Sequence, residues 1–270
     1  MSEIYSQRAQ VEGVVAQYAA LLLDPETVDA IQRDKALVPA DADRESYFGD
    51  QHLSYWLSGR ADLFMVRRLV PDASFAHVLD FGGATGRFAR HIPLVDPSAK
   101  VTIADLNVNH IEWVEQNLNS AISGIKVSPY PYFPLADASV SLCVGLSVFT
   151  HIDSYESGWL ADIHRVLIPG GYAVLTIHSE QSWPLLGRNS WLLDVLLRDS
   201  EFAAAYREGE PMPAGRRVYA SDKNSIEHNC QVFMDEQYVR SRWGKRFEVV
   251  EISHRAHHDF QAAVVLRKSL

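Results

Sequence analysis

The chain has 270 residues, of which 47% are hydrophobic and 22% charged, and its formal net charge is −9. This composition excludes a disordered or fibrous chain and is typical of a globular protein with a substantial core. The negative charge and the lack of a clustered basic face argue against nucleic acid as a partner. No segment approaches the roughly 18 apolar residues that span a bilayer, and no leader pattern opens the sequence. We therefore expect a cytoplasmic protein without membrane insertion.

Residues 1–72 are predicted to form a helical N-terminal cap. Apolar residues from Val11 to Leu22 recur at helical spacing, and Asp24-Pro25 is typical of a helix start, here for a second helix that runs to about Ala36. Another long helix is expected from Leu53 until shortly before Pro71. The remaining residues, 73–270, are expected to form the main domain.

From His77 the pattern changes to short apolar runs separated by helical segments. The runs read as strands at 77–81, 101–104, 140–146 and 172–177, and the helices are expected at 108–122 and 158–167. Pro169-Gly170-Gly171 is expected to stop the second helix and turn into the next strand. This alternation predicts an α/β fold with a doubly wound sheet. After a mixed insertion at 181–246, two last strands at 247–252 and 262–266 are too closely linked for a parallel crossover and should pair antiparallel.

The most informative stretch is a glycine-rich turn directly after the first of these strands. Gly82, Gly83 and Gly86 lack side chains, so a ligand can approach the backbone, and a helix expected to begin near Arg87 offers free N–H groups. Asp105 ends the second strand, where a carboxylate is placed to accept hydrogen bonds from both hydroxyls of a ribose. The alternative for Asp105 is an acid that favours the start of the following helix.

The turn does not have the dinucleotide-binding spacing, because Ala84 and Arg87 stand where two of its glycines belong. Together with Asp80, the turn resembles the first motif of the class I S-adenosylmethionine-dependent methyltransferases, with Ala84 in place of the middle glycine. The resemblance extends over residues 55–180 and 233–268. It implies a Rossmann-like seven-stranded sheet with a final antiparallel strand, and S-adenosylmethionine as cofactor.

The same resemblance assigns further cofactor contacts. Leu106 would pack on the adenine and Pro129 or Tyr130 would cover it, while Leu146 and Ser147 follow the fourth strand of the family. Asp80 either organises the methionine end of the cofactor or only ties down the glycine turn, since a buried carboxylate needs partners. Arg60 either pairs with the cofactor carboxylate or is an ordinary arginine on a helix surface.

Two histidines are candidates for catalysis. Methyl transfer to a hydroxyl requires alignment of the acceptor and removal of its proton, a task that suits histidine. His151 follows the fourth strand and His178 the fifth, and ligands bind at the carboxyl ends of such strands. The alternative for each is a histidine that caps a helix or lines the wall. Acidic residues after His151 are typical of a helix start, so no metal is expected.

The sequence thus predicts a methyltransferase that acts on the hydroxyl of a sugar, a glycan or another small molecule. The choice of acceptor is implied by likeness to bacterial methyltransferases of glycan and natural-product assembly, carried by residues 81–90, 147–151 and 261–268. Two alternatives remain open, a nicotinamide-dependent oxidoreductase and a catalytically silent cofactor-binding scaffold subunit. The apolar residues of the insertion, including Trp183 and Trp191, form either a core or lid face or the surface of a homodimer.

Overall fold

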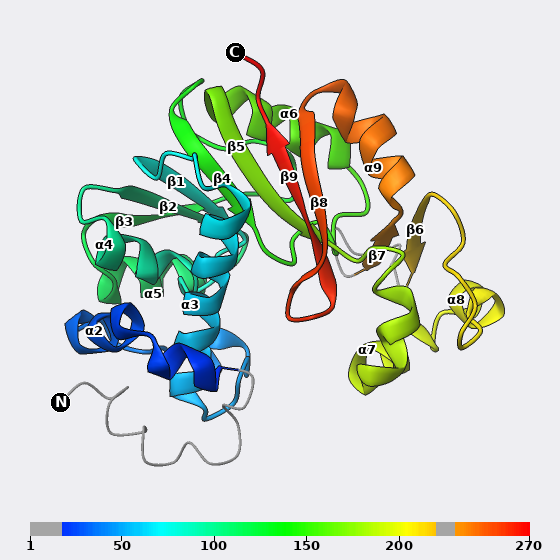
Figure 1. The fold of residues 1–270 in the computed structure, drawn as a ribbon, viewed down its shortest axis with the longest axis horizontal. Coiled ribbons are helices and arrows are strands. Elements are labelled where there is room, and N and C mark those ends of the chain that lie inside the picture. Colours follow the sequence, from blue (N-terminus) through cyan, green and yellow to red (C-terminus); the bar gives the residue numbers. More distant parts are fainter. Residues whose placement is uncertain (1–17, 220–229) are drawn as a thin grey trace. The chain divides into compact units, whose positions relative to one another are not determined.

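The computed structural model describes residues 18–219 and 230–270, and the chain divides into two compact units, residues 1–126 and 127–270 (Figure 1). The first part of the helix predicted from Val11 lies outside the described residues. The predicted division of the chain after residue 72 remains a prediction. Each unit is described by itself below.

Helices dominate the first part of unit 1, as expected. Asp24 accepts the backbone N–H of Thr27 at 2.7 Å and Pro25 occupies the first turn, so helix α2 (Pro25–Arg33) begins where the sequence predicted, although it ends three residues early. The long predicted helix is α3 (His52–Leu69). The other helical segments of this unit are η2 (Ala19–Leu23), η3 (Ala42–Arg44), η4 (Ala89–His91), α4 (Ile92–Val95) and α5 (Val108–Asn117).

Unit 1 also contains three parallel strands, β1 (His77–Phe81), β2 (Lys100–Asp105) and β3 (Ile122–Lys126), with β2 in the middle. The sequence analysis missed β3 and was wrong to extend the preceding helix to Ile122. Ile122 and Ile125 are three residues apart, which mimics helical spacing. Pairing with β2 decides the outcome, and Gly124 lets β3 lie directly against Ile111 of α5.

The helix expected to begin near Arg87 is short and irregular. Turns follow the glycines, the 3-10 helix η4 begins at Ala89, and α4 adds a single α-helical turn with Pro93 near its start. Proline fits only the first turn of a helix, so a helix that began at Arg87 would be broken by Pro93. The N–H groups of Gly86 and Arg90 are used within the turn, by the carbonyls of Gly83 and Gly86.

Unit 2 contributes four strands, β4 (Val140–Gly145), β5 (Leu167–Ile177), β8 (Glu248–His257) and β9 (Gln261–Arg267). Strands β4 and β5 are parallel and flank helix α6 (Glu156–Val166) in sequence, whereas β9 pairs antiparallel with both β5 and β8. The predicted antiparallel pair is confirmed. Pro169-Gly170-Gly171 lies inside β5 rather than before it, because a shift in register between Val140 and Leu142 accommodates the irregular segment.

The insertion forms helices and a small antiparallel sheet. Its elements are η5 (Trp183–Arg188), α7 (Ser190–Leu196), α8 (Ser200–Ala205), β6 (Arg216–Tyr219), β7 (Gln231–Met234), α9 (Glu236–Arg242) and η6 (Trp243–Lys245). Trp183, Phe202, Tyr219 and Phe233 form the centre of an aromatic cluster in this unit. Trp183 is therefore a core residue, while Trp191 is exposed. A homodimer remains a prediction.

Together the two units contain the seven strands of a mixed sheet, and the α/β Rossmann-like fold predicted from the sequence is confirmed. In the described part of the chain, no helix has both the length and the apolar character needed to cross a membrane. Strand order within the sheet is β3-β2-β1 in unit 1 and β4-β5-β9-β8 in unit 2. Most of the predicted site residues lie at or after the carboxyl ends of β1, β2, β4 and β5, whereas Arg60 lies on α3 and Tyr130 follows β3.

Candidate cofactor and acceptor sites

The glycine turn after β1 adopts backbone conformations that side chains disfavour. Gly82, Ala84 and Gly86 have φ angles of 68°, 46° and 79°, all in the left-handed region. Glycine adopts this region without steric cost, whereas an L-residue is strained there by about 1 kcal/mol or more. This explains why the methyltransferase motif has glycine at the position of Ala84, and it shows that the turn keeps its shape with alanine.

Asp80 lies directly beneath the turn. Its side chain is buried, and a Cβ atom at Gly83 would lie 2.5 Å from its Oδ2 atom, so only glycine fits there. Oδ2 has no hydrogen-bond partner among the described residues. Burial raises the pKa of the Asp80 carboxyl to about 7, against the opposing effect of the Arg87 guanidinium. Asp80 thus supports the turn, and a contact with the cofactor remains a prediction.

We expect Asp80 to make the stability of the protein depend on pH. Its pKa is raised in the folded state, so the folded protein binds more protons than the unfolded chain and stability falls as pH rises from about 4 to about 7. Asp80→Asn should remove this fall, which amounts to about 3 kcal/mol between about pH 4.5 and pH 8. The free energy of unfolding in urea at about pH 4.5 and pH 8 measures it, with exposed Asp72→Asn as control. An Asp80→Asn variant with the same pH dependence as the wild type would contradict this assignment.

Asp105 is hydrogen-bonded to the glycine turn. Its Oδ2 accepts the backbone N–H of Ala84 at 2.9 Å, and its Oδ1 accepts the N–H of Asn107 at 2.8 Å. His110 Nδ1 lies 3.4 Å from Oδ1, and although burial opposes it, Asp105 raises the pKa of His110. The structure therefore brings together the two features that the sequence analysis singled out. A ribose would meet a carboxylate whose lone pairs are already partly engaged by the turn.

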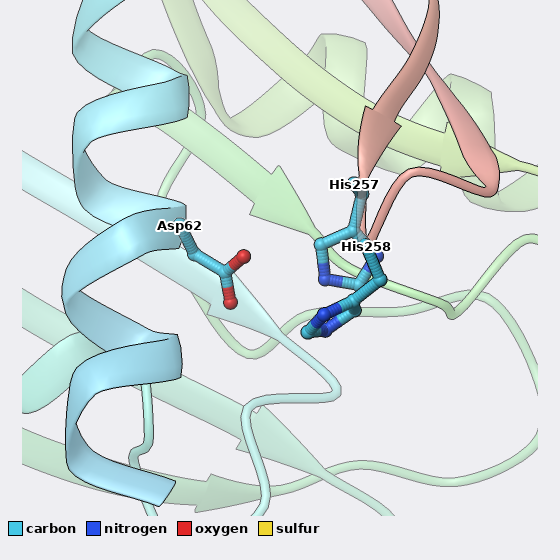
Figure 2. A group of neighbouring side chains, drawn as sticks. All are labelled: Asp62, His257 and His258. Atoms are coloured by element: carbon cyan, nitrogen blue, oxygen red, sulfur yellow. The ribbon is translucent and has the colours of Figure 1, made fainter. Parts of the chain in front are cut away.

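Helix α3 supports the other side of the turn, and the sequence analysis missed this role. The Tyr55 hydroxyl lies 3.1 Å from Thr85 Oγ1, and a Cβ atom at Gly59 would meet the carbonyl of Arg87 at 1.9 Å. Asp62, which lies on α3 (Figure 2), forms an ion pair with Arg87. The available signal was the glycine on an otherwise long helix, which indicates that another backbone comes close.

Arg60 points elsewhere within unit 1. Its guanidinium is buried, 2.9 Å from Glu26 Oε1, and its Nε donates to Thr27 Oγ1 at 3.3 Å. The structure thus joins α3 to α2 through Arg60 and does not bring this side chain to the glycine turn. Its predicted contact with the cofactor carboxylate requires that these bonds break.

In unit 2, the residues after β4 form a polar network with β5 and β9. Ser147 has a φ angle of 60°, and its N–H donates to Thr176 Oγ1 at 2.7 Å. The hydroxyls of Ser147 and Thr176 both donate to Gln261 Oε1, at 3.1 and 2.7 Å. Sequence analysis predicted Ser147 but missed Gln261, because only the antiparallel pairing of β9 with β5 brings it to this edge.

His151 has a defined tautomer. Its Nδ1 lies 2.8 Å from the carbonyl oxygen of Cys230. A carbonyl only accepts hydrogen bonds, so Nδ1 carries the proton and the neutral ring has its lone pair on Nε2. The Cys230 thiol in turn donates to the carbonyl of His151 at 3.0 Å, which fixes both segments. The ring can therefore accept a proton at Nε2.

His178, unlike His151, is buried among aromatic side chains. It is buried, with its ring centroid 4.9 Å from that of Phe233 and 5.4 Å from that of Phe260. Burial, together with nearby His151 and His257, lowers the pKa of His178 to about 3. It therefore stays neutral at physiological pH and is a weaker base than an ordinary histidine. His257 lies at the end of β8 with His258 beside it, their ring centroids 4.0 Å apart (Figure 2).

Leu106 and Tyr130, predicted to contact the adenine, have accessible side chains. Leu106 is 41% exposed and follows β2, while Tyr130 is 55% exposed and packs edge-on against Tyr155. Leu146 is partly buried directly after β4. The cofactor contacts of these three residues remain predictions.

Glu156 ties the insertion to the segment that follows His151. Its carboxylate lies 2.7 Å from Arg216 Nε of β6 and accepts from Trp243 Nε1 at 2.8 Å and from the Tyr238 hydroxyl at 3.2 Å. Arg216 also donates to the carbonyls of Ile152 and Asp153. Glu156, one of the acidic residues after His151, is thus the centre of a polar cluster.

Glu156→Ala is expected to lower the free energy of unfolding by about 3 kcal/mol, because it leaves the Arg216 charge, the buried Trp243 N–H and the partly buried Tyr238 hydroxyl without their partner. Thermal and urea unfolding measure the loss. Exposed Glu210→Ala serves as the control and should change stability by less than about 0.5 kcal/mol. Equal effects of the two substitutions would contradict the role of Glu156 as the centre of the cluster.

The family comparison and the structure comparison both find methyltransferases. Residues 79–175 match the family described as a methyltransferase domain. A S-adenosylmethionine-dependent methyltransferase from Methanosarcina mazei is 18% identical with a TM-score of 0.52, over 75% of this chain and 97% of that one. A second, from Mesorhizobium loti, is 12% identical with a TM-score of 0.55, over 77% and 98%. The glycopeptide N-methyltransferase MtfA is 13% identical with a TM-score of 0.51, over 77% and 89%.

A comparison with curated proteins gave no significant sequence match. Residues 79–175 are thus similar to a methyltransferase domain, and the solved methyltransferase structures share the Rossmann-like fold of this chain. Residues 79–175 include both the glycine turn and Asp105.

Proposed function

We propose that the protein is a S-adenosylmethionine-dependent methyltransferase that methylates a hydroxyl group of a sugar, a glycan or another small molecule. The observation that carries the proposal is the hydrogen bond between Asp105 and Ala84, which joins the glycine turn to the acid expected to hold a ribose. The methyltransferase domain match over residues 79–175 supports the same conclusion.

The cofactor contacts follow from the sequence prediction. Gly82, Gly83, Ala84 and Gly86 would receive the methionine end of the cofactor above Asp80, and Asp105 would accept the ribose hydroxyls. Leu106, Tyr130, Leu146 and Ser147 would contact the adenine and its surroundings. When bound, the cofactor supplies an electrophilic methyl group on a sulfonium, which is a good leaving group.

His151 is the proposed base. Its Nε2 lone pair would take the proton of the acceptor hydroxyl as the new carbon–oxygen bond forms and the carbon–sulfur bond breaks. The hydrogen bond from Nδ1 of His151 to the carbonyl of Cys230 keeps the proton on Nδ1, so the lone pair needed for this step is on Nε2. The remaining task of the protein is to align acceptor and methyl group.

Two arguments support a hydroxyl acceptor. The sequence resembles bacterial methyltransferases of glycan and natural-product assembly, and a hydroxyl must lose its proton to a base such as His151 during methylation. Incubation of the full chain with methyl-labelled S-adenosylmethionine and a panel of sugars, glycans, phenols and amines tests the proposal by mass spectrometry, and a parallel incubation replaces the methyl donor with NAD⁺ or NADP⁺. We expect a product with one added methyl group on oxygen. Methylation of amines alone would overturn the acceptor class, and oxidation of a hydroxyl of the panel with formation of NADH or NADPH would favour the oxidoreductase alternative.

A further inference from the structure

One nitrogen of His178 is buried without a partner. The residue is 4% exposed, and its Nδ1 has no hydrogen-bond partner among the described residues. Phe233 and Phe260 lie against the ring, so no polar group is available from these neighbours. Buried polar atoms are nearly always paired, and an exception in a native structure often marks the place of a water molecule or a ligand.

Gln261 indicates which nitrogen of His178 carries the proton. Thr176 Oγ1 accepts the N–H of Ser147 and donates its own proton to Gln261 Oε1. With Oε1 so engaged, the amide Nε2 faces His178 Nε2 at 3.5 Å. An amide nitrogen only donates, so Nε2 of His178 must accept, and the neutral ring carries its proton on Nδ1. The unpartnered nitrogen is therefore a donor.

His151 and His178 belong to neighbouring segments on one edge of β7. The N–H of Val232 donates to the carbonyl of Thr150 at 2.8 Å, and the N–H of Met234 donates to the carbonyl of His178 at 2.9 Å. These two N–H groups are two residues apart on one strand, a rise of about 7 Å. The carbonyls of His178 and of Thr150, the residue before His151, are therefore bound at points about 7 Å apart along β7. By their tautomers, His151 carries a lone pair on Nε2 and His178 carries an N–H on Nδ1.

We propose that His178 donates a hydrogen bond from Nδ1 to the methyl acceptor, and that the acceptor carries a second oxygen close to the hydroxyl that is methylated, as a vicinal diol does. This rests on the proposed function, because the ligand is the acceptor of the methyl group. Gln261 is a positioning residue that keeps the proton on Nδ1. The apolar rings around His178 strengthen the hydrogen bond by excluding water.

A measurement of the tautomer of His178 tests whether its proton is on Nδ1. Long-range ¹H–¹⁵N spectra of the full chain with ¹⁵N-labelled histidine, from about pH 6 to about pH 8, distinguish protonated from unprotonated ring nitrogens. His178→Phe identifies the signals. We expect a neutral ring with its proton on Nδ1, and in Gln261→Glu a proton on Nε2, because a carboxylate only accepts. A wild-type ring protonated on Nε2 or on both nitrogens would overturn the proposal.

Paired substitutions test the contact with the acceptor. The amide nitrogen of His178→Asn is bonded to Cγ, as Nδ1 is, whereas that of His178→Gln lies one bond further out. With the acceptor found in the labelled screen, we expect kcat/KM to fall about 3-fold in the asparagine variant and about 30-fold in the glutamine variant. Replacing the acceptor by a deoxy analogue without the second hydroxyl should lower kcat/KM of the wild type and hardly change kcat/KM of His178→Gln. An equal fall in kcat/KM in the wild type and in His178→Gln would overturn the role of His178 as a hydrogen-bond donor to the acceptor.

These results are separable from the proposed function. Titration of the same samples with S-adenosylhomocysteine reports cofactor binding and does not depend on His178. A chain that binds this nucleoside but shows the other tautomer rejects only the inference, whereas a chain that does not bind it rejects the methyltransferase.

Discussion

Asp105→Ala is expected to weaken the binding of S-adenosylhomocysteine by about 100-fold or more. The substitution removes a charged acceptor for the ribose hydroxyls, and hydrogen bonds to a charged group contribute about 1.5–3 kcal/mol each. It also releases the N–H of Ala84, which Asp105 holds at 2.9 Å, so the glycine turn loses a support. Isothermal titration calorimetry of wild type and variant measures the effect.

The two contributions of Asp105 can be separated with a modified ligand. In the wild type, S-adenosylhomocysteine without the ribose 2′-hydroxyl should bind about 10-fold more weakly, whereas in Asp105→Ala the same change of ligand should have little effect. Equal losses in both proteins would show that Asp105 does not bind the ribose and acts only through the protein itself. Asp72→Ala, at an exposed position of the same unit, should bind both ligands like the wild type.

His151→Ala is expected to lower kcat about 100- to 10,000-fold, the range by which a positioned base accelerates proton transfer. The dissociation constant of S-adenosylhomocysteine should stay within about 2-fold, because the side chain is assigned to the acceptor and not to the cofactor. Initial rates with labelled cofactor and the screened acceptor measure the first quantity, and calorimetry the second.

His164→Gln provides the matched control for His151. His164 lies on α6 with its ring against Phe247 and belongs to the same unit, yet it has no place in the proposed chemistry. Its substitution should leave kcat within about 2-fold of the wild type. A His151→Ala enzyme with a wild-type rate would remove His151 from the mechanism, and the deprotonation would then need another group.

Strands that form continuous apolar runs were predictable from the sequence, as β1 and β4 show. Their residues are buried, so the runs show no alternation that could be taken for another structure. The start of α2 was predictable because Asp24 and Pro25 act locally. Strand β3 was not, since its spacing is ambiguous and its pairing with β2 is a contact between distant residues. The single-turn α4 is a different case, because Pro93 is a local signal that the sequence analysis did not use.

For the candidate site, the sequence predicted the residues of the motif but not their supports. Asp105 and the glycine turn were identified by their spacing, and the structure joins them. Tyr55, Asp62 and Gln261 were missed because their roles depend on which side chains tertiary structure brings near them. The pKa of His178 likewise follows from burial among aromatic rings, which no local pattern reveals.

Titration of the purified chain with S-adenosylhomocysteine, and separately with NADH, tests the central claim most directly. The account predicts saturable binding of one S-adenosylhomocysteine per chain and no heat of binding with NADH. Saturable binding of NADH together with no response to millimolar S-adenosylhomocysteine would contradict it.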